Sequence, residues 1–232
     1  MNIRSYSVVF NGADPEAAFS AAMEGDHSLR AAASGDTEQA APQVIRVLEE
    51  EAAAGQPVTR TDMETCFEQM NLFLTEARAE VSLAGVIING SEAQLFSVGN
   101  ARALRFSRGT LVMHSDDHTE AYEKLFDKSR DDPKEYNELR CRAESRELKR
   151  ALGRRDNFLP QFYPAFKLKP DDALVLCTEG FWRYLSTMEM ELDYRKSAGP
   201  EEWLRIMARR VMMKAGKRLD DSSFAVTAIM TE

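Results

Sequence analysis

Short apolar segments that end at turn residues recur along the chain and predict most of its strands. The clearest is Ala-Leu-Val-Leu-Cys at 173–177, which follows a Pro-Asp-Asp turn and ends before Thr178. A short apolar run bounded by turn residues is typical of a strand buried on both faces. We therefore predict a central strand at 173–177, followed by a helix that begins at the aromatic pair Phe181-Trp182.

Similar segments predict strands before and after this one. They cover residues 3–10, 28–33, 83–88, 93–98, 103–106, 111–113 and 224–230. Asn89-Gly90 is a typical hairpin turn. Further Gly-containing turns follow residues 98 and 106, so the four strands between 83 and 113 are predicted to form an antiparallel meander.

Apolar residues at helical spacing predict three longer helices. Residues 43–54 carry an apolar face and end at Gly-Gln-Pro, and Thr61-Asp62 is the expected cap of a second helix whose apolar positions run from 63 to 77. Residues 200–214 begin with Pro-Glu-Glu and carry an apolar stripe. This order of elements predicts an α+β fold in which helices pack on antiparallel sheets.

Composition narrows the class of protein. A chain of 232 residues with 44% hydrophobic and 29% charged residues fits one globular domain spanning 1–232. The net charge of −8 argues against nucleic-acid and acidic-membrane partners. No apolar stretch approaches the ~20 residues needed to cross a bilayer, and the first residues lack a signal pattern. We therefore expect a cytoplasmic protein.

Nucleophilic catalysis by a side chain has little support in the sequence. The three cysteines are widely spaced without a zinc-type pattern, which favours reduced thiols, and Cys177 lies inside the apolar strand. Nothing places a thiol beside one of the three histidines. The highly charged segment 116–149 is interpreted as a solvated face, helical or looped.

Several short motifs follow one another in a characteristic order. They are SLAG at 82–85, VGNAR at 98–102, DHT at 117–119, LKRALG at 148–153, LKPDD at 168–172, VLCTEGFWRYLS at 175–186 and DDSS at 220–223. The sixth is similar to the segment LLxSDGLWDxLS, and LKPDD is similar to the stretch that leads into it. The remaining five are similar, in order, to GTT-like, VGDSR, DHS, LTRALG and D[DN]xT motifs. Together they resemble the metal-dependent Ser/Thr protein phosphatases of type 2C, the PPM family. The resemblance implies a β-sandwich flanked by antiparallel helix pairs.

The resemblance also implies a pair of Mg²⁺ or Mn²⁺ ions, which prefer carboxylate oxygens as ligands. Two ligand positions keep a carboxylate here. Asp220 matches the family residue directly, and Glu179 stands in place of an Asp, with a side chain one methylene longer.

The carboxylate that bridges both metals in the family lies in an ADGxGG turn. The best match here is Ala-Ser-Gly-Asp at 33–36, which puts Ser34 at the bridging position and keeps Gly35. A neutral hydroxyl is a poor ligand for a divalent ion in place of a carboxylate. A shift of two residues in this match would instead let Asp36 serve as the ligand.

Two more family motifs are eroded. In the segment that resembles RxxNED, Glu16 fits the Glu, Ala17 replaces the Asp, and no Arg is present to bind phosphate. Asn100 replaces a further carboxylate in the VGDSR-like turn. Asp14 and Asp26 are additional acids in this region, which we interpret as solvated turn residues.

The intact fold motifs beside the eroded ligand set lead to one hypothesis and two alternatives. The first is a pseudophosphatase or weakly active regulatory or binding module in Ser/Thr phospho-signalling. Its partner would be a phosphoprotein or a protein kinase, and it would work with or without a metal cofactor. The second is an active Mg²⁺- or Mn²⁺-dependent phosphatase that uses metal-activated water. The third is a scaffold whose partner docks on the segment 116–149.

Overall fold

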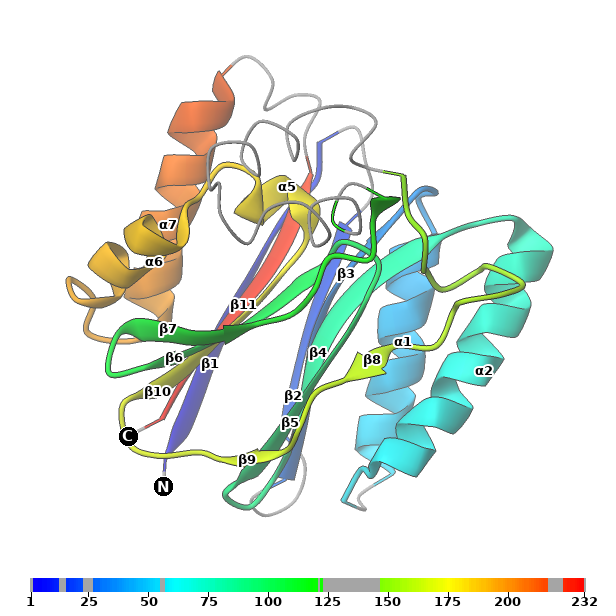
Figure 1. The fold of residues 1–232 in the computed structure, drawn as a ribbon, viewed down its shortest axis with the longest axis horizontal. Coiled ribbons are helices and arrows are strands. Elements are labelled where there is room, and N and C mark those ends of the chain that lie inside the picture. The colour runs from blue at the N-terminus through cyan, green and yellow to red at the C-terminus, as the bar shows by residue number, and fades with distance from the viewer. Residues whose placement is uncertain are drawn as a thin grey trace.

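The computed structural model describes residues 2–12, 16–22, 27–54, 57–120, 122, 147–216 and 223–231, with the backbone alone for 16–22. Two antiparallel sheets face each other in the middle of the molecule (Figure 1). The first sheet has the order β1-β11-β10-β6-β7. Its strands are β1 (Ile3–Phe10), β11 (Phe224–Thr231), β10 (Asp172–Cys177), β6 (Arg102–Ser107) and β7 (Thr110–His114). The predicted central strand is the middle strand of this sheet.

The second sheet has the order β2-β3-β4-β5-β8, and β9 also pairs with β5. Its strands are β2 (Glu16–Ala22), β3 (His27–Gly35), β4 (Val81–Asn89), β5 (Glu92–Val98), β8 (Gln161–Phe162) and β9 (Phe166–Lys167). Within the described residues all pairs in both sheets are antiparallel.

Helices cover the outer faces of the sandwich (Figure 1). The pair α1 (Ala40–Ala53) and α2 (Arg60–Ala77) packs on the second sheet, and the pair α6 (Thr187–Tyr194) and α7 (Pro200–Ala215) packs on the first. A short helix, α5 (Glu179–Trp182), lies at one end of the strands. The predicted α+β class, with antiparallel sheets flanked by helix pairs, is confirmed.

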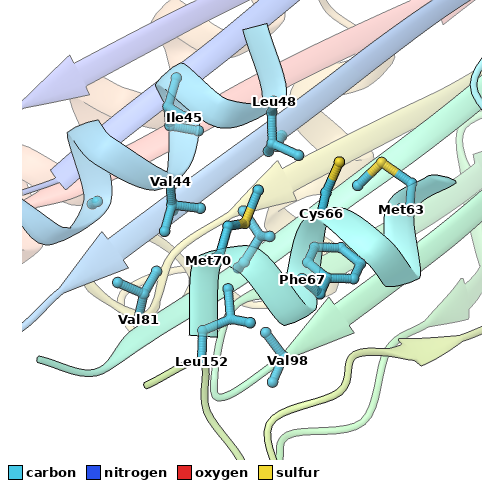
Figure 2. Packing of buried hydrophobic residues seen from close by; sticks show 14 of the residues in the cluster. Val44, Ile45, Leu48, Met63, Cys66, Phe67, Met70, Val81, Val98 and Leu152 are labelled. Atoms are coloured by element: carbon cyan, nitrogen blue, oxygen red, sulfur yellow. The ribbon is translucent and has the colours of Figure 1, made fainter. Parts of the chain in front are cut away.

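The core has three apolar layers because side chains on a strand alternate between its faces. On β3, Leu29, Ala31 and Ala33 face the helices α1 and α2, whereas Ala32 faces the other sheet. Figure 2 shows the helix-facing layer, in which Phe67 and Met70 of α2 pack beside Val44 and Leu48 of α1. A third layer, built around Trp203, fills the space between the first sheet and α7. No helix in the described part of the chain is long and apolar enough to cross a membrane.

The N-cap of the second helix lies two residues earlier than predicted. Thr59, rather than Thr61, is the N-cap, and its side chain accepts a hydrogen bond from the backbone N–H of Asp62. The Asp62 carboxylate in turn accepts from the Thr59 backbone N–H at 2.8 Å, completing a capping box. The Thr59 hydroxyl also donates to the Asp62 carboxylate at 2.6 Å, and this bond together with the one from the backbone N–H lowers the pKa of Asp62.

The predicted four-stranded meander is wrong in one respect. The pairs β4–β5 and β6–β7 form as expected, but β5 pairs with β4, β8 and β9, whereas β6 pairs with β10 and β7. The turn at Gly99-Asn100 therefore carries the chain from one sheet to the other. This connection between the two sheets places Asn100 at one end of the sandwich.

The sequence prediction also missed several elements. Strand β2 is rich in alanine, and α6 follows α5 after a short break rather than continuing it. The small strands β8 and β9 have two residues each. Most of the charged segment 116–149 lies outside the described residues, so its predicted character stays a prediction.

Candidate functional site

One end of the sandwich gathers segments that are far apart in the sequence. Because neighbouring strands are antiparallel, β3 ends where β4 begins, and β10 ends where β11 begins. The turn between β5 and β6 and the helix α5 close the same end (Figure 1). We call this end the rim and define it by Ser34, Ser82, Asn100 and Glu179.

Hydrogen bonds and strand register connect the first three rim residues. Ser34 is paired with Ser82 across β3 and β4. The Ser82 hydroxyl accepts a hydrogen bond from the backbone N–H of Asn100 at 3.2 Å. A Cβ atom on Gly99 would lie 2.1 Å from that hydroxyl, and Gly99 has φ of +78°, so only glycine fits this turn. The turn is therefore held directly against the start of β4.

The indole of Trp182 attaches α5 to the same turn. Its Nε1–H donates to the backbone oxygen of Asn100 at 2.8 Å. The guanidinium of Arg102 stacks on the Trp182 ring at 3.5 Å and donates from Nε to the Asp117 carboxylate at 2.7 Å. The side chains of Arg102 and Asp117 are only 11% and 7% exposed, so this pair is nearly withdrawn from water. It fixes the orientation of α5 and hence of Glu179.

His118 supports the turn from the other side. Its backbone N–H donates to the Gly99 oxygen at 2.8 Å, and its Nε2 lies 3.0 Å from the Gln161 side-chain oxygen. Burial lowers the pKa of His118, although the hydrogen bond to Gln161 opposes the shift. The lowered pKa favours the neutral imidazole at neutral pH. His118 thus acts as a structural turn residue.

Glycine at position 180 brings Glu179 close to the start of β11. A Cβ atom on Gly180 would lie 1.9 Å from the backbone oxygen of Ser223. The hydroxyl of Ser223 accepts a hydrogen bond from the backbone N–H of Gly12 at 2.7 Å, so the end of β1 meets the same point. Asp220, three residues before Ser223, lies outside the described residues.

Replacing Gly180 by alanine is expected to lower the free energy of unfolding by about 1–3 kcal/mol, because α5 and β11 must move apart to admit the methyl group. A urea titration followed by circular dichroism measures this loss. An unchanged midpoint would show that the two segments separate without cost and would contradict the close approach seen here.

Glu179 forms an ion pair with Arg183, four residues further along the chain. Both side chains are 18% exposed. Glu179 is the first residue of α5, and Arg183 is its C-cap with helical φ and ψ, so the two side chains project from the same face. The segment LLxSDGLWDxLS, which residues 175–186 resemble, has Asp at the position of Arg183, so this chain has a cation beside Glu179 where that pattern has an anion.

The remaining predicted site residues surround the end of β3. Glu16 is paired with Ser34 across β2 and β3, and Ala17 is paired with Ala33, which places both at this end through the backbone. Gly35 ends β3 where α1 approaches, since a Cβ atom there would lie 2.9 Å from the Cβ of Ala40.

Asp36 is exposed and connects the end of β3 to the residue before β4. Its backbone N–H donates to the Glu80 oxygen at 3.1 Å, and its Oδ1 accepts from the Glu80 N–H at 2.9 Å. One of its two carboxylate oxygens is thus used by the backbone. This bond gives Asp36 a structural role at the turn.

Comparison with solved structures identifies the architecture. Over 100% of this chain and 96% of the other, the structure superimposes on the serine/threonine phosphatase Stp1 from Staphylococcus aureus with a TM-score of 0.86 and 13% identity. The S. agalactiae serine/threonine phosphatase gives 0.85 at 14% identity over 100% of both chains. The chain has the fold of the PPM-type serine/threonine phosphatases.

Sequence comparisons add nothing to this result, since no protein-family model and no curated protein sequence matches the chain. Another structure with the PPM fold is the catalytic domain of the phosphatase PstP in complex with two manganese ions. It matches with a TM-score of 0.80 and 16% identity over 98% of this chain and 97% of PstP. The PPM fold can therefore carry a manganese pair, and the question is whether this chain has the ligands.

The described rim residues do not fit a pair of divalent ions. They provide one carboxylate, Glu179, together with the hydroxyls of Ser34 and Ser82 and the amide of Asn100. Within the described residues, no group of three or more His, Cys, Asp or Glu side chains is arranged to hold a metal ion. Divalent Mg²⁺ and Mn²⁺ require several oxygen ligands, of which carboxylates carry the compensating charge.

Sequence reasoning found Glu179, Ser34 and Asn100 but not the residues that connect them. The predicted helix began at Phe181, two residues after Glu179, so the helical spacing of four residues between Glu179 and Arg183 was not recognised. The contacts of Ser82 and Trp182 with the Asn100 turn join segments 18 and 82 residues apart, respectively. Sequence spacing carries no signal for contacts of this kind.

Proposed function

We propose that the protein is a pseudophosphatase, or at most a weakly active phosphatase, that acts as a regulatory or binding module in Ser/Thr phospho-signalling. The observation that carries the proposal is the state of the surviving ligand: Glu179 is paired with Arg183, and Ser34 stands at the position where the family resemblance implies the bridging carboxylate. The proposal therefore rests on two findings together, the chemistry of the rim residues and the PPM-type fold.

The reasoning depends on what metals supply in this kind of hydrolysis. A metal pair lowers the pKa of a bound water to give the nucleophile and neutralises the phosphate oxygens. No described side chain at the rim replaces either contribution, because the available groups are a paired carboxylate, two hydroxyls and an amide. A fold maintained without this chemistry is suited to binding, with a cytoplasmic phosphoprotein or protein kinase as the partner.

Calorimetric titration of Mn²⁺ into metal-free protein tests the proposal. We expect one weak site or none, and no Mn²⁺-dependent hydrolysis of phosphoserine or phosphothreonine peptides. The Asp220→Ala variant is titrated in parallel, because Asp220 is the other retained ligand position. Two tight sites that disappear in Asp220→Ala, with peptide hydrolysis that stops in Glu179→Ala, would overturn the proposal.

The alternative is an active Mg²⁺- or Mn²⁺-dependent phosphatase with a rearranged ligand set. The pairing of Glu16 with Ser34 favours it, because this register brings an acidic residue to the end of β3. Such an enzyme would use Glu179, Asp220, Glu16 and Asp36. The same titration separates the two proposals, since tight metal binding is expected only for the alternative.

A further inference from the structure

We infer that the Arg183 guanidinium takes the place of a bound cation at the rim and keeps divalent metal ions from Glu179. The inference rests on the proposed function and extends it, because it assigns part of the loss of metal affinity, beyond the missing carboxylates, to one residue of this chain. It makes Arg183 a built-in counter-ion rather than an incidental surface charge.

The geometry of α5 supports this assignment. The helix has only four residues, and its N-terminal residue Glu179 and its C-cap Arg183 are spaced so that the two side chains meet. Glutamate four residues before a basic residue is the favourable order for such a pair. Because each side chain is 18% exposed, water screens the pair less than it screens a surface pair.

A metal ion that used Glu179 would meet an electrostatic obstacle. It would have to displace the guanidinium or bind within a few ångströms of its positive charge. Charges interact more strongly at a partly buried site than in water, so both routes weaken metal binding. The Asp found at this position in LLxSDGLWDxLS would have the opposite effect.

Arg102, a second arginine near the rim among the described residues, does not provide this compensation. Arg102 is held by the carboxylate of Asp117 and by the ring of Trp182. Its charge is therefore balanced by a carboxylate of its own. Arg183, by contrast, forms an ion pair with Glu179 itself.

The test replaces Arg183 by glutamine and titrates Mn²⁺ into the metal-free variant by calorimetry, with the signal of free Mn²⁺ in electron paramagnetic resonance as a second readout. We expect Mn²⁺ to bind to Arg183→Gln at least ~10-fold more tightly than to the unchanged protein. A neighbouring charge commonly alters the affinity of a carboxyl group for a proton by 10-fold or more, and the same charge acts on its affinity for a metal ion. Adding the Glu179→Gln substitution to Arg183→Gln is expected to remove the gain.

Arg205→Gln is the matched control. Arg205 pairs with Glu201 at the same spacing of four residues in α7, but these side chains are 67% and 54% exposed and lie away from the rim. The control removes the same charge and is expected to leave Mn²⁺ binding unchanged. If Arg183→Gln does not fold, Arg183→Met removes the charge while keeping an apolar stem of similar length.

The results separate the inference from the proposed function. If neither the unchanged protein nor the folded Arg183 variants bind Mn²⁺, the inference is overturned and the pseudophosphatase proposal remains. If Arg183→Gln and Arg205→Gln increase the affinity for Mn²⁺ equally, the increase comes from the change in net charge, and the inference is overturned. If the unchanged protein binds two Mn²⁺ ions tightly, both fail.

Discussion

Replacing Asp117 by alanine is expected to lower the free energy of unfolding by about 3–5 kcal/mol. The substitution leaves the guanidinium of Arg102 nearly buried, at 11% side-chain exposure, without its carboxylate partner. Removing one member of a buried ion pair is costly because the remaining charge is held away from water and has lost its oppositely charged partner. Equilibrium unfolding in urea measures the loss.

The same substitution is expected to loosen the rim. Asp117 orients Arg102, Arg102 stacks on Trp182, and Trp182 donates to the backbone of Asn100. We therefore expect the near-ultraviolet circular dichroism and fluorescence of Trp182 to change in the folded variant, before any denaturant is added. Comparison with a Trp203→Phe background isolates the signal of Trp182, since the chain has two tryptophans.

Glu80→Ala provides the control for this prediction. Glu80 pairs with Arg154 at 3.0 Å, but the two side chains are 36% and 31% exposed, and the ion pair is accordingly expected to contribute about 0.2–1 kcal/mol. An equal loss in Asp117→Ala and Glu80→Ala would mean that burial of the Arg102–Asp117 pair has no special effect. It would contradict the role assigned to this pair.

Much of the fold was predictable because apolar segments and turns mark the strands directly. Strand β1 has the predicted bounds, and β10 and β11 each differ from prediction by one residue. Helix α7 begins at the predicted Pro200, whose fixed φ suits the first turn. In each of these elements the local pattern and the tertiary packing agree.

The sequence-based predictions failed where strand pairing between distant segments determines the structure. The sequence GNAR at 99–102 has the form of a hairpin turn, but it joins two sheets, and only the pairing of β6 with β10 reveals this. Strand β2 has no hydrophobic period, because alanine is compatible with helix, strand and loop. Its extended conformation is associated with the pairing of every residue of β2 with residues 28–34 of β3.

The candidate site was predictable as a set of positions but not as a chemical environment. Ser34 and Asn100 are at one end of the sandwich together with Glu179, as the order of the motifs implied. The sequence did not reveal that Glu179 is paired with Arg183, since an ion pair depends on burial as well as on spacing. Asp220 stays a predicted ligand position, outside the described residues.

Several motif residues that this chain retains have structural roles within the described part of the chain. Gly99 is needed where the turn approaches Ser82, Gly180 where α5 approaches Ser223, and Gly35 where β3 meets α1. Trp182 and Arg102 hold α5 to the turn. Packing alone is therefore sufficient to account for their presence. The resemblance of these motifs to a phosphatase family is accordingly evidence for the fold, whereas the chemistry depends on Ser34, Asn100 and Glu179.

Replacing Trp203 by alanine is the second substitution expected to have a large effect, a loss of about 3–5 kcal/mol in the free energy of unfolding. Trp203 is fully buried between α7 and the first sheet. Its ring lies edge-on to Phe106 at 5.3 Å and to Tyr194 at 5.2 Å, and its Nε1–H donates to the Met190 oxygen at 2.9 Å. Alanine would leave a cavity and remove the hydrogen bond that joins α7 to α6.

The comparison that tests this prediction is Met213→Ala, on the same helix. Met213 is 75% exposed, and its truncation is expected to change the free energy of unfolding by less than about 0.5 kcal/mol. Both variants are measured by urea denaturation at constant protein concentration. If Trp203→Ala cost no more than Met213→Ala, the layer between α7 and the sheet would be loosely packed. The PPM-type sandwich would then be stabilised mainly by the layer under α1 and α2, in which Phe67 is buried.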